Sequence, residues 1–476
     1  MKSAAKVLAQ LDQRHLWHPF TQMRDWLRRE PIVIVEGKGA VLRDTRGREY
    51  LDANSSIWTN LHGHAHPKIN AAIVRQLKKI SHSSALGLAN EPAALLGQQL
   101  IAAAAKAKPP APARHKLERV FFSDDGSTAM EVALKLAYEF ARRTGRSRAP
   151  QFLSLDSAYH GDTVGAVSLG HIDLFHRSFS GLLFKSGKAM SPYCYRCPFN
   201  RARPERADAR EYRQCQWECV GQVEQKFAAQ KKKGNPYAAF VFEPLMQGAA
   251  GMIPQPTGWL GRVAEIARGH GAQLIADEVM TAFGRVTASP RSLLASHQEN
   301  VHPDYAAVAK GLSGGYLPLS ATLTTGEVFN AFLGEYDEFK TFFHGHSFTA
   351  NQLGSAAALA NLELLQSPAC ATARQTLERT LREELKTLWS LPAVGDIRQV
   401  GLVVGVELVK NWKTREPFPL RDQAGIRVCQ AMSRRGVLTR PVGNVIVLMP
   451  PYCTTKPQAQ KMVRTLRSSI QETLPL

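Results

Sequence analysis

The segment AQLIADEV at residues 272–279 is a short apolar run closed by acidic residues, and similar runs occur earlier in the chain. These earlier runs are VFFS (120–123), QFLSL (151–155) and AAFVFEPL (238–245). Apolar residues at helical spacing begin near Thr128 and recur at about 260–269. Strands that alternate with helices predict βαβ units, and therefore an α/β fold with a mostly parallel sheet between layers of helices.

The pattern changes after about residue 355, which suggests a second domain. Helical spacing appears at 356–365 and 373–388, followed by strand candidates at 397–409 and 445–451. Such an order is typical of an α+β domain. We therefore expect three segments: 1–69, 70–350 and 351–476. The middle segment forms the large domain, with a cysteine-containing insertion at about 190–220, and the two ends combine into a smaller α+β domain.

Length and composition describe an ordinary globular protein of two or three domains: 476 residues, 44% hydrophobic and 21% charged. No run approaches the roughly 18 apolar residues of a membrane span, and the first residues lack the apolar core of a signal peptide. We expect a cytoplasmic protein. The net charge of +20 raises the question of nucleic acid. The basic residues are dispersed, however, which favours a solvated surface and anionic small ligands.

Two groups of residues raise the question of a metal. Four cysteines form a CxxC and, after 17 residues, a CxxxC: Cys194, Cys197, Cys215 and Cys219. This spacing resembles a zinc ribbon with one extra residue, so we hypothesise a structural metal site, with reduced thiols as the alternative and a disulfide as the weakest. His62, His64 and His66 alternate, but the neighbouring glycine and proline favour a structured loop, and no acidic ligand is near in sequence.

Asp277 and Lys310 form the most informative pair. Asp277 closes the run at 272–279, and Lys310, 33 residues later, opens the glycine-rich stretch AKGLSGGYLP. Pyridoxal phosphate needs a carboxylate that keeps its ring nitrogen protonated and a lysine that holds it covalently. The pair therefore indicates this cofactor, although an acid after a strand is also a common cap and a lysine before glycine is commonly solvated.

Other residues provide the remaining parts of such a site. Asp125, Gly126, Ser127 and Thr128 stand between a strand and a helix, where free amides and hydroxyls bind anions or simply cap the helix. Tyr159 follows the strand QFLSL and could stack on a flat ring, or be an ordinary buried tyrosine. Arg440 precedes the strand candidate at 445–451, where it could bind a carboxylate or form a surface salt bridge. The chain contains neither GxxxxGK[ST] nor GxGxxG, which argues against P-loop and dinucleotide sites.

These motifs occur in the order found in the class III, or ω-type, aminotransferases of fold type I, and the chain resembles that family from about residue 16 to its end. The motifs that carry the resemblance are LWHPFTQM, SSIWTNLHGHAHP, SAYHGDTVGAVS, EPLMQGAAGM, ADEVMTAFGR, AKGLSGGYLPLSATLTT, HGHSFTANQ and TRPVG. The resemblance implies the fold of type I pyridoxal phosphate transferases, aminotransferase activity and pyridoxal 5'-phosphate as cofactor.

The resemblance also implies roles for individual residues. Lys310 binds the cofactor covalently and moves the proton, Asp277 pairs with the pyridine nitrogen, and Tyr159 covers the ring. The implied cofactor-binding residues are Asp125, Gly126, Ser127, Tyr159, His160, Asp277, Lys310, His346 and Ser347. In the family the HGHSF segment completes the phosphate site of the partner subunit. His346 and Ser347 therefore imply a homodimer with shared active sites.

The opening motif and the surroundings of Arg440 are similar to members that convert 8-amino-7-oxononanoate to 7,8-diaminononanoate in biotin biosynthesis. The implied substrate-binding residues are Phe20, Ile57, Trp58, Tyr159, Lys310, Gly345 and Arg440, with Arg440 on the substrate carboxylate. Phe20 stands where members that use adenosylmethionine commonly have tyrosine, and Ile57-Trp58 where they have two tryptophans. His346 also stands where others have proline. These departures resemble members that use lysine.

Several members that use adenosylmethionine share those features, so we expect S-adenosyl-L-methionine as amino donor and keep L-lysine as the alternative. Another ω-aminotransferase, acting for example on ornithine, 4-aminobutyrate or a diamine, is a rival within the family. A transcription regulator with a degenerate aminotransferase domain is a rival from another class. It is disfavoured because LWHPFTQM begins 15 residues into the chain, which leaves no room for a winged-helix module.

Overall fold

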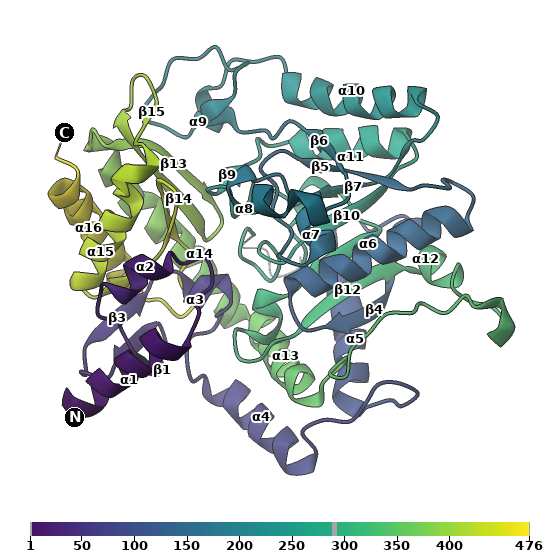
Figure 1. Ribbon diagram of the computed structural model, residues 1–476, viewed down its shortest axis with the longest axis horizontal. Helices are drawn as coiled ribbons and strands as arrows, with labels where there is room; N and C mark the ends of the chain where they lie inside the picture. The colour runs from purple at the N-terminus through teal and green to yellow at the C-terminus, as the bar shows by residue number, and fades with distance from the viewer. Residues whose placement is uncertain (1, 288–292, 476) are drawn as a thin grey trace.

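A computed structural model describes residues 2–287 and 293–475, with helices around a central sheet (Figure 1). Seven of the described strands form this sheet, and all are parallel except β12, which is antiparallel to both neighbours. In spatial order they are β4 (Leu117–Ser123), β12 (Ser320–Thr325), β11 (Tyr305–Val308), β10 (Gln273–Asp277), β7 (Tyr237–Phe242), β5 (Gln151–Leu155) and β6 (Gly187–Ala189). The predicted α/β fold with a mostly parallel sheet is confirmed.

The central strands β7, β10 and β11 are buried along their whole length and are mostly apolar, because helices cover both faces of the sheet. In β7, Ala239 and Val241 pack in the cluster that contains α6 (Gly126–Arg143), whereas Phe240 and Phe242 pack with α10 (Glu218–Lys232) and α11 (Trp259–Gly269). Successive side chains of a strand point to opposite faces, so both sets are buried. The other helices of this region are α4 (Pro67–Lys79), α5 (Glu91–Ala104), α7 (Val164–Leu169), α8 (Asp173–His176), α12 (Gly326–Asn330) and α13 (Gln352–Leu365).

The two ends of the chain meet in a second sheet. Its strands are β1 (Ile34–Lys38), β2 (Val41–Asp44), β3 (Glu49–Asp52) and β16 (Val437–Leu438). β3 and β16 are parallel, with Leu51 opposite Val437. The sequence predicts that the ends combine in this way, while the domain boundaries at 69 and 350 stay a prediction.

The C-terminal part contains a third sheet. Its strands are β13 (Val394–Val400), β14 (Val403–Asn411), β18 (Val445–Leu448) and β17 (Pro441–Val442), with β15 (Glu416–Pro417) paired to β14. The single strand expected at 397–409 is wrong, because Gly401 takes a φ of +57° and turns the chain into the antiparallel pair β13 and β14. Glycine has no Cβ and reaches this left-handed conformation without strain. The helices here are α14 (Pro368–Leu385), α15 (Ala424–Arg434) and α16 (Lys456–Thr473).

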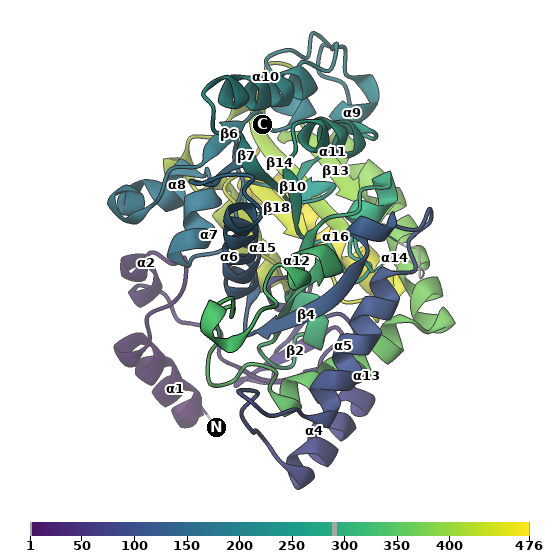
Figure 2. The same ribbon diagram turned by 90° about the vertical axis from the view of Figure 1, so that its right-hand side faces the viewer.

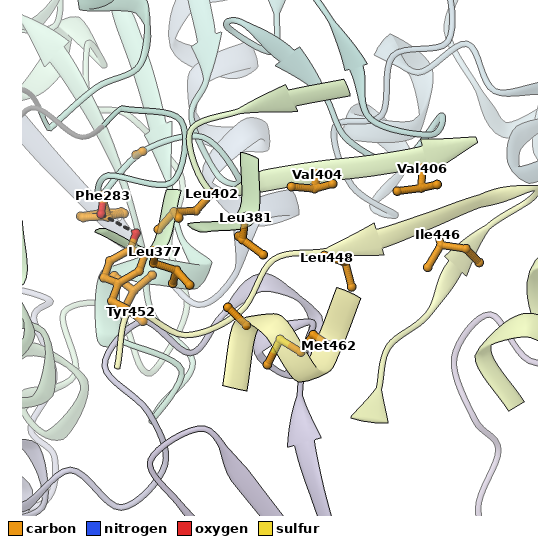
Figure 3. Packing of buried hydrophobic residues seen from close by; sticks show 14 of the residues in the cluster. Phe283, Leu377, Leu381, Leu402, Val404, Val406, Ile446, Leu448, Tyr452 and Met462 are labelled. Carbon is orange, nitrogen blue, oxygen red and sulfur yellow. Dashed lines mark hydrogen bonds between the residues drawn. The ribbon is translucent and has the colours of Figure 1, made fainter. Parts of the chain in front are cut away.

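One hydrophobic core connects the C-terminal part to the segment that follows β10. Figure 3 shows Val404 and Val406 of β14 beside Ile446 and Leu448 of β18, with α14 and α16 contributing Leu377, Leu381 and Met462. At one end of this core, the Tyr452 hydroxyl donates a hydrogen bond of 2.8 Å to the Phe283 carbonyl. The two parts are therefore packed together near the end of β10, where Asp277 lies.

The first two helices lie at the edge of the molecule. α1 (Lys2–His15) and α2 (Met23–Leu27) are neighbours in both views (Figures 1 and 2). The Trp26 indole N–H donates to the Asp12 carboxylate at 2.9 Å and ties one to the other. In the described residues, no helix is long and apolar enough to cross a membrane.

The predicted insertion at about 190–220 is mostly irregular, with α9 (Ala209–Tyr212) as a short helix. It packs on the C-terminal sheet through Glu407 of β14. The Tyr193 hydroxyl donates to Glu407 at 2.6 Å, and the Arg196 Nε donates to it at 2.7 Å. The fully buried Arg398 of β13 completes the network at 2.8 Å from the same carboxylate. A small hairpin, β8 (Met246–Gln247) with β9 (Ile253–Pro254), follows β7.

Candidate active site

A cavity of about 450 Å³ lies where β10 and β11 end. The carboxyl ends of parallel strands in open α/β sheets are the usual place for ligands. Eight of the residues singled out in the sequence line this cavity: Trp58, Asp125, Gly126, Ser127, Tyr159, His160, Asp277 and Lys310. Residues from five distant segments of the sequence therefore converge on one place.

Asp277 is the last residue of β10, and the residue is 5% exposed. Its Oδ2 lies 2.7 Å from His160 Nδ1, and its Oδ1 accepts a hydrogen bond of 3.1 Å from the Val279 amide. These contacts orient the carboxylate into the cavity. A carboxylate held in this way can balance a positive charge on a bound ring.

Lys310 follows β11 and has a φ of +37°, which is unusual for a residue with a side chain. Burial lowers the pKa of its ammonium group, although the nearby charges of Asp277 and Glu243 oppose the shift. Its Nζ lies 4.9 Å from the centre of the Trp58 ring. A lowered pKa favours the neutral amine, the form that acts as nucleophile and base.

The start of α6 forms an anion-binding corner. An added Cβ at Gly126 would lie 2.7 Å from a Val279 methyl carbon, so no side chain fits there. Asp125 caps the helix by accepting from the Thr128 amide at 2.9 Å. The Thr128 hydroxyl bonds to Asp125 in return, so this residue caps the helix, which is one of the two roles that the sequence left open. The Ser127 hydroxyl accepts from the Asp162 amide at 3.0 Å and stays beside the cavity.

Tyr159 stands at one side of the cavity. Its hydroxyl donates to the Asp162 carboxylate at 2.7 Å, and burial raises its pKa, so the group stays neutral. Its ring stacks on His176 with 6.4 Å between ring centres and an interplanar angle of 13°. Phe175 and Phe20 meet it edge-on at 6.3 and 6.5 Å. The ring is therefore fixed by aromatic neighbours on several sides.

Glu243 is a cavity residue that the sequence analysis missed. It is 6% exposed and accepts hydrogen bonds from the Gly248 amide at 2.8 Å and the Tyr159 amide at 3.3 Å. Burial raises its pKa to about 7. The signal was present in the sequence, since Glu243 closes the apolar run at 238–245 in the same way that Asp277 closes the run at 272–279.

The other predicted substrate and cofactor residues do not line the cavity. Arg440 is exposed, and its Nη2 donates to the Phe20 carbonyl at 3.0 Å. The Phe20 ring in turn contacts Tyr159, which lines the cavity. Ile57 is 45% exposed. Gly345, His346 and Ser347 lie on a largely exposed segment, where His346 Nδ1 is 3.5 Å from Asp124 Oδ2 and the Ser347 carbonyl accepts from His82 at 2.8 Å.

The helix α3 (Ser55–Trp58) that carries Ile57 and Trp58 is left-handed. The φ angles of Ser55, Ser56, Ile57 and Trp58 are +47°, +48°, +63° and +69°. Side-chain-bearing residues in this conformation cost about 1–2 kcal/mol each, and a β-branched residue such as Ile57 is a marked outlier. The surrounding structure must hold such a segment in place.

Neither metal hypothesis gains support from the geometry. In residues 2–287 and 293–475, no group of three or more His, Cys, Asp or Glu side chains is placed to hold a metal ion, and the four clustered cysteines are free thiols. The alternating histidines point to different partners. His64 Nε2 lies 2.9 Å from Asp52, the acid that sequence proximity did not reveal, and His66 caps α4. His62 is buried against Tyr452, with 5.9 Å between ring centres.

A family profile described as Aminotransferase class-III matches residues 23–470. The chain belongs to the class-III aminotransferases. This aminotransferase is 45% identical over 465 residues to a Geobacter sulfurreducens protein named adenosylmethionine-8-amino-7-oxononanoate aminotransferase, covering 98% of this chain and 97% of that one. A protein of the same name from Aquifex aeolicus is 40% identical, with 98% of each chain covered. The predicted resemblance is therefore confirmed.

Solved structures of class-III aminotransferases have the same fold. The structure named adenosylmethionine-8-amino-7-oxononanoate aminotransferase from Methanocaldococcus jannaschii matches with a TM-score of 0.87 and 37% identity, covering 98% of this chain and 99% of that one. An amine transaminase from an uncultivated Pseudomonas species, in its PLP-bound internal aldimine form, matches with a TM-score of 0.86 and 30% identity, covering 96% and 98%. The predicted type I transferase fold is thus confirmed.

Proposed function

We propose that this aminotransferase uses pyridoxal 5'-phosphate to convert 8-amino-7-oxononanoate to 7,8-diaminononanoate in biotin biosynthesis. The names of relatives that cover nearly the whole chain support the substrate. The observation that carries the chemistry is the convergence of Asp277, His160 and Lys310 on one cavity. A buried carboxylate and a half-buried amine at adjacent strand ends are the pair that this cofactor needs.

The residues present fit the cofactor in charge and in shape. Asp277 would hold the ring nitrogen, and the amides at Gly126 and Ser127 would hold the phosphate, since Gly126 leaves no Cβ in the way. Lys310 would bind the aldehyde carbon. Tyr159, locked by its aromatic neighbours, offers a flat face for the ring. Pyridoxal phosphate supplies an electron sink for the electron pair released when a substrate carbon loses its proton.

The residues of the chain perform the proton transfers. Lys310 Nζ, whose pKa is lowered by burial, would accept the proton from the amine-bearing carbon of the donor and pass it to the carbon of the cofactor. Asp277 stays oriented by His160 and balances positive charge in the cavity. The Trp58 ring lies beside Lys310 and shields one side of the amine. For the keto substrate the same groups work in the opposite direction, by microscopic reversibility.

Arg440 would bind the carboxylate of 8-amino-7-oxononanoate. It donates one hydrogen bond to the Phe20 carbonyl at 3.0 Å, which leaves further guanidinium donors exposed to solvent. Phe20 lies between this arginine and Tyr159. A long substrate could therefore place its carboxylate on Arg440 while its keto group reaches Lys310.

The amino donor is tested directly by mixing the cofactor-loaded protein with one amine at a time. S-adenosyl-L-methionine is the expected donor, and L-lysine is the alternative. The donor converts the bound cofactor to its amine form, which changes the visible absorbance, and only this form should then aminate 8-amino-7-oxononanoate. If neither amine supports that transfer, another ω-aminotransferase activity takes the place of the proposed one.

We also infer that two copies of the chain form a homodimer with shared active sites. The segment around His346 and Ser347 carries large exposed apolar side chains, which are Tyr336, Phe339, Phe343 and Phe348. Several large apolar side chains exposed on one short segment are a feature of protein interfaces. A second copy of this chain is the occupant that would place His346 and Ser347 at a neighbouring cavity, as the family resemblance implies.

Mixing two inactive variants tests this sharing. Chains with Lys310→Ala lack the catalytic amine, and chains with His346→Ala plus Ser347→Ala lack the segment that would complete the neighbouring site. If each site uses residues of both chains, mixed dimers contain one intact site and recover activity when the variants are unfolded and refolded together. No recovery in mixed dimers, or a monomeric mass by light scattering, would contradict the inference.

A further inference from the structure

The carboxylate of Asp52 accepts hydrogen bonds from Ser56, in the middle of the left-handed helix α3 (Ser55–Trp58). The Asp52 Oδ1 accepts from the Ser56 amide at 3.1 Å, and its Oδ2 accepts from the Ser56 hydroxyl at 2.9 Å. His64 Nε2 lies 2.9 Å from the same Oδ2. Burial would raise the pKa of Asp52, but the hydrogen bonds from His64 and Ser56 outweigh it and lower the pKa, so the carboxylate is charged.

Arg285 donates hydrogen bonds to backbone carbonyls at the C-terminal end of α3 and just after it. Its side chain is fully buried, and its Nη2 donates to the Asn60 carbonyl at 2.9 Å and to the Trp58 carbonyl at 3.4 Å. Its Nη1 donates to the Pro450 carbonyl at 3.0 Å, and its guanidinium carbon lies 5.1 Å from the centre of the Tyr452 ring. Tyr452 belongs to the core shown in Figure 3. The C-terminal end of α3 is thus anchored in the core, while its centre depends on Asp52.

The result of this anchoring is the position of Trp58. Its ring lies 4.9 Å from Lys310 Nζ and lines the cavity. Its indole Nε1 is buried, and no hydrogen-bond partner for it occurs in the described part of the chain. The position of the ring therefore depends on apolar packing against the cluster that contains Phe242 and Met280, on the contact with Lys310, and on the backbone conformation of α3.

We propose that Asp52 is a positioning residue, which holds Ser56 in the left-handed conformation and thereby sets the Trp58 ring against Lys310. Without the two bonds from Ser56, residues with a Cβ return to right-handed or extended backbone. Trp58 would then move relative to the amine and change the width of the cavity. The catalytic effect of Asp52 rests on the proposed function. Its effect on the position of the Trp58 ring is independent of that function.

Fluorine NMR of protein labelled with 5-fluorotryptophan follows Trp58 without any substrate. The chain has seven tryptophans, and the resonance lost in Trp58→Phe identifies the one at this position. Asp52→Asn keeps the shape of the side chain but loses its charge and one acceptor. We expect the Trp58 resonance to shift or broaden in Asp52→Asn. An unchanged resonance would overturn the proposal.

A pair of double variants isolates the backbone strain. Asp52→Asn with Ser56→Gly and Asp52→Asn with Ser56→Ala both lose the hydroxyl, but only glycine adopts a positive φ freely. We expect glycine to return the Trp58 resonance toward its original position and alanine to leave it shifted. Equal behaviour of the two double variants would show that Asp52 does not act by offsetting strain, and would refute the proposal.

Kinetics provide the second readout. Misplacement of a catalytic group by about 1 Å costs about a hundredfold in rate, so kcat/KM should fall by up to that factor in Asp52→Asn and recover in part with Ser56→Gly. Asp44→Asn is the matched control, because Asp44 is also buried and accepts from the Arg46 and Arg48 amides at 2.9 Å within the same sheet. It should lower thermal stability while leaving the Trp58 resonance in place.

The outcomes separate the two proposals. If wild-type protein does not aminate 8-amino-7-oxononanoate, the proposed function fails, but the fluorine measurement still tests Asp52. If wild-type protein is active and Asp52→Asn keeps full kcat/KM and an unchanged resonance, the positioning role fails alone. If Asp52→Asn does not fold, Ser56→Ala decides instead, since it removes only the bond of 2.9 Å to the carboxylate.

Discussion

The floor and the rim of the cavity are built in different ways. The floor is made of Asp277, His160 and Lys310, of which Asp277 is the last residue of β10 and the other two follow the parallel strands β5 and β11. The rim, made of Phe20, α3 and Arg440, comes from the two ends of the chain and has irregular or left-handed backbone. Regular elements hold groups to small tolerances, whereas loops tolerate change. The difference indicates that the floor determines the reaction and the rim selects the substrates.

Lys310→Ala is the most severe test of the floor. We expect turnover to fall by at least about a thousandfold, because one amine both binds the cofactor and moves the proton. The visible absorbance of the lysine-bound cofactor should disappear, while the circular dichroism of the fold remains. Lys188→Ala is the control, since its amine lies at the surface, 3.4 Å from Asp156. Turnover near the wild-type rate would contradict the assigned role of Lys310.

Two buried aspartates at opposite ends of the central sheet allow a comparison between the floor of the cavity and a purely structural site. Asp277 lies 2.7 Å from His160 in the cavity, and Asp304 lies 2.9 Å from His115 just before β11. Asp277→Asn should reduce turnover by about a hundredfold or more, because the charge facing the cofactor is lost.

Asp304→Asn should instead reduce stability by about 3 to 5 kcal/mol, because Arg268 and His115 lose their buried partner. Urea melts and steady-state kinetics on both variants separate the two effects. If Asp304→Asn lost turnover as steeply as Asp277→Asn at full folding, the carboxylate of the cavity would have no special role.

Arg440→Ala tests the rim. The variant should weaken the half-reaction with 8-amino-7-oxononanoate more than the half-reaction with the donor. A charge-assisted hydrogen bond contributes about 1.5 to 3 kcal/mol, which corresponds to roughly tenfold to a hundredfold in affinity. Arg421→Ala, an exposed arginine of the C-terminal part, is the control. Equal losses in both half-reactions, measured by single turnover, would assign Arg440 a structural role.

His62, which is buried against Tyr452, produces the smallest expected effect. Burial lowers its pKa from 6.5 to about 3, so the folded chain holds it neutral. Because the folded pKa is below the unfolded one, the contribution to stability is complete above about pH 6.5 and is lost as the pH falls toward 3. The slope is at most about 1.4 kcal/mol per pH unit.

His62→Gln should reduce the loss of stability as the pH falls. The free energy of unfolding from urea melts at about pH 7 and about pH 5 would measure this change. His15→Gln, at the exposed end of α1, is the control. A variant that loses stability on acidification as steeply as the wild type would show that other groups carry the pH dependence.

The alternation of apolar runs and helical spacing was enough to predict the central sheet, because the central strands of a sheet covered on both faces form short apolar runs in the sequence. The same runs identified Asp277, since an acid at the end of a buried strand is conspicuous in sequence. Glu243 carried the same signal and was missed. The split of 397–409 into β13 and β14 was also missed, because one glycine in a continuous apolar run does not by itself reveal a turn.

The sequence by itself determined the fold class, the family and the residues of the floor, because local apolar patterns and short motifs encode them. Only the tertiary structure decided how the rim is built. The bond between Arg440 and Phe20 joins residues 420 positions apart, and the pairing of Asp52 with His64 turns an apparent metal motif into a support for Trp58. Such contacts depend on where distant backbone segments meet, and no local pattern records that.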